Sequence, residues 1–174
     1  ESCLVTTTTT TVEPVACSIP QEFSSEEATY PTEIAIALGT DVGEVVLNYD
    51  PIVVPDRFVV WWDGNVVIDT GYVSTSTGMY NYGDTFRSSL TSALLGKVDP
   101  VTGSTYPFAN PAHDVDNYPI VTQVTGGGAQ NESFDKTDAT PTVALIRVYA
   151  PIEGTAWELT MDCPITITTT TTQE

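Results

Sequence analysis

Apolar and polar residues alternate along several short segments of the chain, as they do in β-strands with one buried face. Residues 45–50 alternate in this way, with Val45, Leu47 and Tyr49 on one side. In the next segment Phe58, Val60 and Trp62 alternate with Arg57, Val59 and Trp61. The turn signal Asp63-Gly64-Asn65 then leads into the apolar residues 66–68, which predicts a tight β-hairpin. Further strands are predicted at residues 34–38, 143–150 and 156–161. The pattern predicts an all-β protein, which we expect to be a jelly-roll-like β-sandwich.

Two parts of the chain depart from this β pattern. Residues 85–95 carry Phe86, Leu90 and Leu94 at roughly helical spacing, which predicts one short helix. Residues 96–135 are rich in Gly, Pro, Asn and Asp and include Gly126-Gly127-Gly128. We interpret residues 80–135 as a long, loop-rich insertion in the sandwich, and long ordered loops often carry binding.

Threonine runs stand at both ends of the chain. Because Thr is β-branched and favours extended backbone, a run of six can form a strand of about 20 Å that adds to an open sheet edge. Thr runs can also be O-glycosylated stalks in secreted chains. We predict a Thr-rich arm over residues 1–16, a sandwich over 17–164 and a second arm over 165–174. The predicted assembly residues of these arms are Thr6, Thr7, Thr8, Thr9, Thr10, Thr11, Thr168, Thr169, Thr170, Thr171 and Thr172.

The three cysteines are Cys3, Cys17 and Cys163, and no pair has the spacing of a thiolate metal site or a redox motif. Cys3 and Cys163 each precede a Thr run at the same offset, which has the form of an internal repeat. A disulfide between Cys17 and Cys163 would close nearly the whole domain, and Cys3 would then pair upstream or with another subunit. Three buried free thiols are the alternative.

Charge limits the partners of the chain. Lys plus Arg number 5 and Asp plus Glu number 23, giving a net charge of −18 and a calculated pI of about 4.1. Nucleic acids and anionic membrane surfaces are bound through basic patches, so we expect neither as a partner. No apolar run approaches the roughly 20 residues that span a bilayer, so we expect no membrane insertion either.

Catalytic motifs are scarce. His113 is the one histidine, and no Gly-x-Ser-x-Gly, P-loop or Gly-x-Gly-x-x-Gly after a strand accompanies it. Because the chain has 23 acidic residues, sequence spacing cannot identify a pair of catalytic carboxylates among them. We therefore expect that the protein is not an enzyme.

Calcium is the cofactor that the composition brings into question, since oxygen ligands crowd the first hairpin. The candidate ligands are Asp50, Asp56, Asp63 and Asp69. Their spacing does not fit an EF-hand loop, and Asp63 is also an ordinary turn residue. Asp56, which stands next to Arg57, could alternatively form a structural ion pair with it.

Several segments together resemble a known module. They are Gly-Glu-Val-Val-Leu-Asn-Tyr-Asp at 43–50, Val-Pro-Asp-Arg-Phe at 54–58, Asp-Gly at 63–64, Asp-Thr-Gly-Tyr-Val at 69–73, Thr-Pro-Thr at 140–142, Val-Tyr-Ala-Pro at 148–151, Gly-Thr-Ala-Trp at 154–157 and Cys-Pro at 163–164. This set resembles a β-sandwich module of structural proteins of tailed bacteriophages, often bordered by poly-Thr linkers, with relatives in bacterial extracellular proteins. The resemblance spans residues 17–164 and implies a structural role on the virion surface or in a fibre.

The expected function is therefore a virion decoration or fibre subunit that assembles through its arms with copies of itself or with neighbouring subunits, on the virion surface or outside the cell. The alternative is a carbohydrate-binding or adhesive module of a secreted bacterial protein. In that case surface glycans would stack on aromatic residues of the insertion. The candidates are Tyr80, Tyr82, Tyr106, Phe108 and Tyr118, which could instead pack the insertion onto the sandwich.

Overall fold

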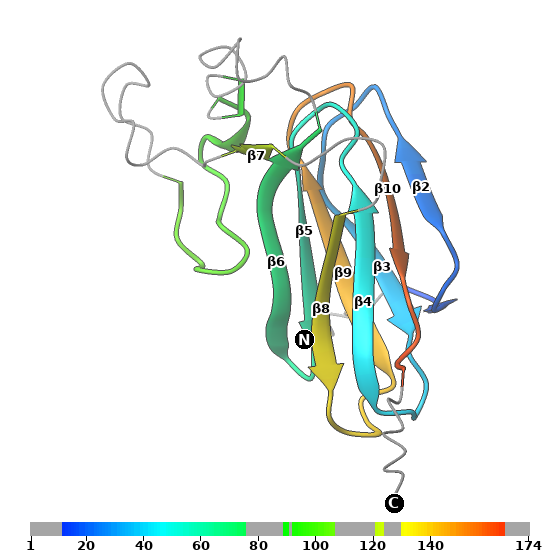
Figure 1. The fold of residues 1–174 in the computed structure, drawn as a ribbon. Coiled ribbons are helices and arrows are strands. Elements are labelled where there is room, and N and C mark those ends of the chain that lie inside the picture. Colours follow the sequence, from blue (N-terminus) through cyan, green and yellow to red (C-terminus); the bar gives the residue numbers. More distant parts are fainter. Residues whose placement is uncertain (1–11, 76–88, 91, 107–120, 124–129, 166–174) are drawn as a thin grey trace, which may run out of the picture.

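The computed structural model describes residues 12–75, 89–90, 92–106, 121–123 and 130–165. Two β-sheets face each other in this part of the chain (Figure 1). The six-stranded sheet has the order β1 (Val15–Ala16), β3 (Thr29–Ala37), β9 (Val143–Ala150), β5 (Asp56–Trp62), β6 (Asn65–Ser74), β7 (Val121–Gln123). The four-stranded sheet has the order β2 (Gln21–Ser24), β10 (Ala156–Met161), β4 (Gly43–Asp50), β8 (Gln130–Lys136).

The strands pair as nested antiparallel partners. β5 pairs with β6, β4 with β8, β3 with β9 and β2 with β10. This nesting, split over two facing sheets, is the jelly-roll arrangement. The all-β sandwich predicted from the sequence is confirmed, and β1 and β7 are short parallel additions at the two edges of the six-stranded sheet.

The core lies between the sheets because alternate residues of each strand point inward. Val45 and Leu47 of β4 face Phe58 and Val60 of β5, and all four are fully buried. The largest buried side chain is Trp157 of β10. Its ring stacks on Phe23 at 5.3 Å and meets Phe58 edge-on at 6.3 Å, so aromatic contacts join β2, β10 and β5.

The predicted hairpin is confirmed at residues 63–64, which join β5 to β6. Asp63 and Gly64 both have positive φ, at 50° and 74°. Two successive residues in this region form the turn whose twist matches that of the flanking strands. A side chain with a branched Cβ would be strained at either position.

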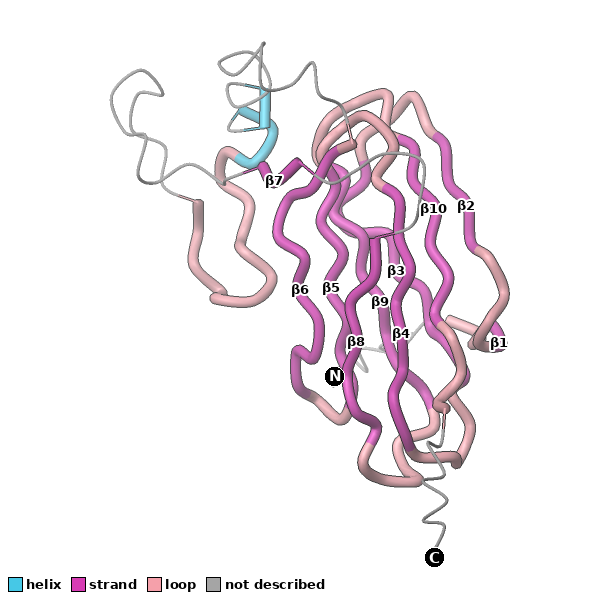
Figure 2. Tube along the Cα trace, in the orientation of Figure 1, coloured by secondary structure: helices cyan, strands magenta, loops and turns pink. Residues whose placement is uncertain are grey.

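Four strands were not predicted from the sequence. β8 falls inside the predicted insertion of 80–135, but it pairs with β4 along its full length. The sequence of β8 is Gln-Asn-Glu-Ser-Phe-Asp-Lys, in which Phe134 is the one apolar residue. No alternation of apolar and polar residues is therefore visible, because the other buried residue is Lys136. β1 lies in the segment predicted as an arm, so the sheet begins before residue 17. The short helix is present at residues 89–90 and 92–94 (Figure 2, cyan).

The described ends of the chain lie at the same end of the sandwich. The amide of Cys17 donates to the carbonyl of Ala37 at the end of β3, and the amide of Ile165 donates to the carbonyl of Glu44 at the start of β4. A disulfide joins Cys17 to Cys163, which are 146 residues apart, and confirms that pairing. We call this the arm end; the predicted Thr runs at 6–11 and 168–172 lie outside the described residues.

Candidate functional site

Arg57 lies at the centre of a charged network on the outer face of the six-stranded sheet. Its Nη2 and Nε donate to the two carboxylate oxygens of Asp69 at 2.6 and 2.7 Å, a two-pronged pair between β5 and β6. Its Nη1 donates to Asp99 at 2.8 Å and to the Tyr106 hydroxyl at 3.2 Å. Asp99 and Tyr106 belong to the insertion, so one nearly buried guanidinium joins two strands to a distant loop.

Burial alone would raise the pKa of Asp99. Hydrogen bonds from the backbone of Thr102 and from the side chains of Arg57 and Tyr106 outweigh it and hold that pKa well below its usual range. Burial alone would lower the pKa of Arg57, but Asp69 and Asp99 raise it above its usual value. Arg57 and Asp99 therefore both stay ionised at physiological pH.

The insertion hairpin, residues 97–106, is shaped by its own hydrogen bonds. The amide of Asp99 donates to the carbonyl of Ser104, and the amide of Tyr106 donates to the carbonyl of Lys97. The Asp99 carboxylate also accepts from the amides of Val101 and Thr102, which fixes the turn.

A second, smaller core lies beneath this hairpin. Leu90 and Leu94 of the helix are fully buried against Tyr72 of β6, with Tyr30 and Ile152 at the margin. Burial raises the pKa of the Tyr72 hydroxyl above its usual value, and the neighbouring Tyr106 and Tyr30 add to this rise. Apolar contact thus attaches the helix to the sheet, while the Arg57 network attaches the hairpin.

Asp56 points the other way, into the sandwich, because successive residues of a strand face opposite sides. It is completely buried, and its Oδ1 accepts from the Thr155 hydroxyl at 2.8 Å, while its Oδ2 has no partner. Burial raises the pKa of Asp56 to about 8, so the carboxyl is neutral near pH 7. The ion pair between Asp56 and Arg57 considered from the sequence is wrong: each has a different partner on a different side of the sheet.

The motif residues that carried the family resemblance therefore bind one another. Asp56 and Arg57 of Pro-Asp-Arg-Phe contact Thr155 and Asp69 respectively, and the amide of Phe58 donates to the Thr70 hydroxyl at 3.0 Å. The contact between Asp56 and Thr155 spans 99 residues, and the other two join the neighbouring strands β5 and β6, so the motif residues help to hold the fold together.

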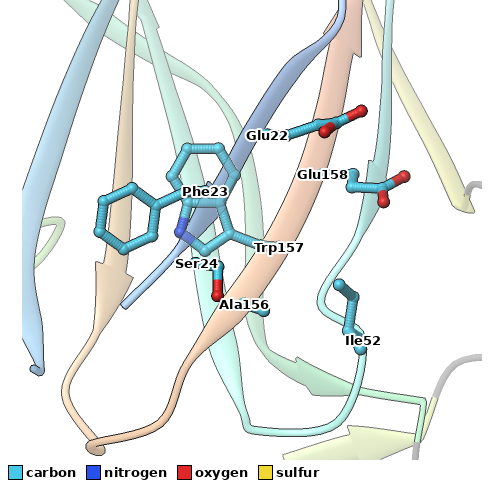
Figure 3. A pocket seen from close by; sticks show the side chains of 7 residues that line it. All are labelled: Glu22, Phe23, Ser24, Ile52, Ala156, Trp157 and Glu158. Carbon is cyan, nitrogen blue, oxygen red and sulfur yellow. The ribbon is translucent and has the colours of Figure 1, made fainter. Parts of the chain in front are cut away.

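A shallow hollow of about 350 Å³ lies against β2 and β10, on the far side of the four-stranded sheet from the core (Figure 3). Glu22 and Glu158 point to this side, away from the stacked pair of Phe23 and Trp157. Glu158 stands opposite both Glu22 and Asp50 in the sheet, which places three acids in a row across neighbouring strands. Carboxylates at this spacing repel one another and favour a positively charged neighbour.

The four candidate calcium ligands are not brought together. Asp50 accepts from the amide of Ile52, Asp63 lies in the β5–β6 turn, Asp56 is inside the sandwich and Asp69 binds Arg57. Within the described residues, no three His, Cys, Asp or Glu side chains are grouped so that they could hold a metal ion.

Tyr106 is the one candidate for glycan stacking that the structure describes. Its hydroxyl donates to Asp99 at 2.8 Å and its ring packs against the second core. It therefore packs the insertion onto the sandwich, the alternative considered from the sequence. Tyr80, Tyr82, Phe108 and Tyr118 lie outside the described residues, as does His113.

Sequence reasoning missed Lys136, which is 1% exposed. Its Nζ donates to the carbonyl oxygens of Asp41 at 2.8 Å and Asp138 at 2.6 Å, and lies 5.9 Å from the Trp62 ring centroid. Lys136 thus fastens the two loops of the arm end. The spacing of Phe134 and Lys136 was the available signal, since residues two apart in a strand share a face.

Comparison with family models, curated proteins and solved structures finds no match to this chain. In the described part of the chain, no helix is long and apolar enough to span a membrane.

Proposed function

We propose that the protein is a structural module of a bacteriophage virion, a decoration or fibre subunit that assembles through its Thr-rich arms. The observation that carries this proposal is the position of the two chain ends. The Cys17–Cys163 disulfide joins the first and last described segments near the β3–β4 end of the sandwich. In this proposal the arms connect one end of the sandwich to neighbouring subunits, and the rest of the sandwich projects from that connection.

Little of β4 remains for the segment that follows Ile165 to pair with. Ile165 pairs with Glu44, and β4 begins one residue earlier, at Gly43. On the other side, β1 ends the six-stranded sheet with just two paired residues, Val15 and Ala16. An ordered Thr strand must have its backbone donors and acceptors paired, and a partner molecule can provide them.

Open sheet edges offer such pairing. β8 pairs with β4 on one side, and no described strand pairs with its other side over residues 131–136. Residues 131–136 extend over about 20 Å, the length of a six-residue Thr strand. β8 contains no proline, so its backbone can accept an added strand from a neighbouring subunit.

The test replaces both Thr runs by Gly-Ser sequences of equal length and measures the mass of the product by light scattering. We expect the replaced chain to lose the assembly formed by the parent chain, because Gly and Ser lack the β-preference of Thr. Chain length, disulfide and net charge are unchanged.

A second variant, with alternate arm threonines changed to valine, is the matched control. Valine keeps the β-branched side chain, so we expect assembly to persist. If the Gly-Ser chain assembles as the parent does, the arms are spacers and the proposal fails.

A further inference from the structure

Within the part of the chain that the structure describes, three buried side-chain atoms of the sandwich core have no hydrogen-bond partner. They are Oγ1 of Thr29, Oδ2 of Asp56 and Nε1 of Trp157. Nearly all buried polar atoms of native proteins have a protein or water partner, because an unpaired one is costly. Three such atoms in one core therefore suggest a partner that they share.

The strand register places Thr29 and Asp56 in one row. Thr29 stands opposite Ala150 in the β3–β9 pair. Arg57 stands opposite Tyr149 in the β5–β9 pair, so Asp56, one step further along this antiparallel register, stands opposite Ala150 from the other side. Residues opposite each other in a sheet point to the same face. Thr29, Ala150 and Asp56 thus form a row across three neighbouring strands, on the inner face of the six-stranded sheet.

The spacing within this row fits a bridging molecule of the size of water. Neighbouring strands lie about 4.8 Å apart, so the Cα atoms of Thr29 and Asp56 are about 10 Å apart. Ala150 between them is completely buried and carries only a methyl group. A water that makes two hydrogen bonds of about 2.8 Å joins atoms about 5–6 Å apart, which suits two short side chains at this separation.

Trp157 reaches the same region from the facing sheet. The Thr155 hydroxyl donates to Oδ1 of Asp56 at 2.8 Å, and Trp157 follows Thr155 by two residues. The Trp157 ring meets Phe58, which follows Asp56 by two residues, edge-on at 6.3 Å. The indole N–H is therefore a third group at this end of the core, and it can only donate.

We propose that the sandwich holds an internal water site between Thr29 and Asp56, with the indole N–H of Trp157 as its third partner. The water accepts from the indole and exchanges hydrogen bonds with the carboxyl and the hydroxyl, and about three partners are usual for a buried water. It joins β3 and β5 of one sheet to β10 of the other. The site lies inside the core, so it does not depend on the proposed assembly.

The chemistry of the site favours neutral water over a monovalent cation. Burial raises the pKa of Asp56 to about 8, so the carboxyl carries a proton near pH 7 and provides no negative charge. Among the described residues, no further acid joins it in a group that could hold a metal ion. A cation here would lose its hydration without an opposite charge to replace it.

Thr29→Val tests the proposal in the full chain, because valine keeps the branched shape of threonine and removes the hydroxyl. Urea unfolding is measured near pH 6, where the Asp56 carboxyl is protonated. If a water binds Thr29, the substitution removes one of its partners, and the unfolding equilibrium constant should rise at least about fivefold. If no water is there, the substitution removes an unpaired hydroxyl and the constant should fall. A fall or no change overturns the proposal.

Thr160→Val is the matched control. Thr160 lies between the buried residues Leu159 and Met161 of β10 and points to the opposite, outer face of its sheet. This substitution should leave the unfolding equilibrium constant within about twofold of the parent. An equal rise in both variants would assign the effect to valine in a strand and overturn the proposal.

A high-resolution crystal structure of the parent gives an independent measurement. We expect a density peak within about 3.2 Å of both Oγ1 of Thr29 and Oδ2 of Asp56, and its loss in Thr29→Val. A parent core without this peak overturns the proposal even if the substitution destabilises the fold.

Exchange of the salt distinguishes water from a cation. Unfolding is compared in sodium chloride and in an equal concentration of tetramethylammonium chloride, whose cation is too large to occupy a site of water size. The unfolding equilibrium constant should agree within about twofold in the two salts. A rise of about fivefold or more without sodium would show that the site holds the cation and overturn the assignment to water.

Discussion

Asp56 is a buried acid whose pKa differs strongly from the usual carboxyl value. Its folded pKa of about 8 lies far above the usual carboxyl value because the group is completely buried, and the Thr155 hydroxyl offsets only part of that cost. Between about pH 4 and pH 8 the unfolded chain releases this proton while the folded chain keeps it. The free energy of unfolding therefore falls as the pH rises through this window, by about 1.4 kcal/mol per pH unit.

Asp56→Asn should remove this dependence. The amide keeps the acceptor for Thr155 but cannot ionise, so the variant and the parent should be equally stable near pH 4. At pH 7 the variant should be more stable by on the order of 2–4 kcal/mol. Urea unfolding of both proteins from pH 4 to pH 8 measures the difference, and two parallel curves would show that Asp56 is not buried as described.

Cys17 and Cys163 carry the second prediction at this scale. Their disulfide closes a loop with a sequence separation of 146, so replacing both by serine should cost about 3–5 kcal/mol of unfolding free energy. Cys3→Ser is the control and should change stability little, because Cys3 has no part in this crosslink. A similar loss from Cys3→Ser would point to exchange among the three thiols.

Among the elements, the insertion hairpin makes one ionic contact with the sheet, between Asp99 and Arg57. Asp99→Asn removes the charge that pairs with Arg57 while Arg57 keeps Asp69, so we expect docking of the hairpin to weaken by about 1–3 kcal/mol. Amide hydrogen exchange should become faster at residues 97–106 and remain unchanged in β4 and β9.

Glu153→Gln serves as the reference for that measurement, because Glu153 is exposed and lies in the β9–β10 connection. Exchange that rises equally throughout the sandwich in Asp99→Asn would mean that the hairpin and the sheet unfold as one unit, contrary to the separate second core.

β10 carries a further element-scale prediction. Glu158 stands between Glu22 and Asp50 on the neighbouring strands, so Glu158→Lys replaces two like-charge neighbours by two opposite pairs. We expect a gain of about 0.5–2 kcal/mol at low salt, shrinking in 1 M NaCl because exposed charges are screened. Melting in both salts measures it, and a loss of stability at low salt would contradict the row of acids.

Strands that bury one full face could be predicted from the sequence, and the others could not. β4 alternates buried and half-buried residues because one side of it lines the core, β5 is a nearly continuous apolar run, and the hairpin after β5 has a specific turn signal. β8 and β2 are edge strands with few apolar residues, so local pattern does not distinguish them from loops.

The contacts of the Arg57 network could not be predicted from local sequence either. The bond between Arg57 and Asp99 spans 42 residues, and nothing in local spacing indicates it. The neighbouring acid, Asp56, suggested a pair that strand geometry forbids.

At the scale of the whole molecule, the proposed assembly requires that one end of the sandwich differ from the other. The chain enters and leaves the jelly roll at the disulfide end, and β4, which starts there, spans about 25 Å over its eight residues. The proposed assembly contact therefore lies at this end, where the disulfide joins the two segments that continue into the Thr-rich runs.

A low-resolution density map of the native assembly tests this claim most directly. When the sandwich is fitted into each subunit's density, the end with Cys17 and Cys163 should face a neighbouring subunit, with connecting density for the arms. A map in which that end faces solvent, while subunits touch through the acidic outer face of β10 and β4, would contradict the account.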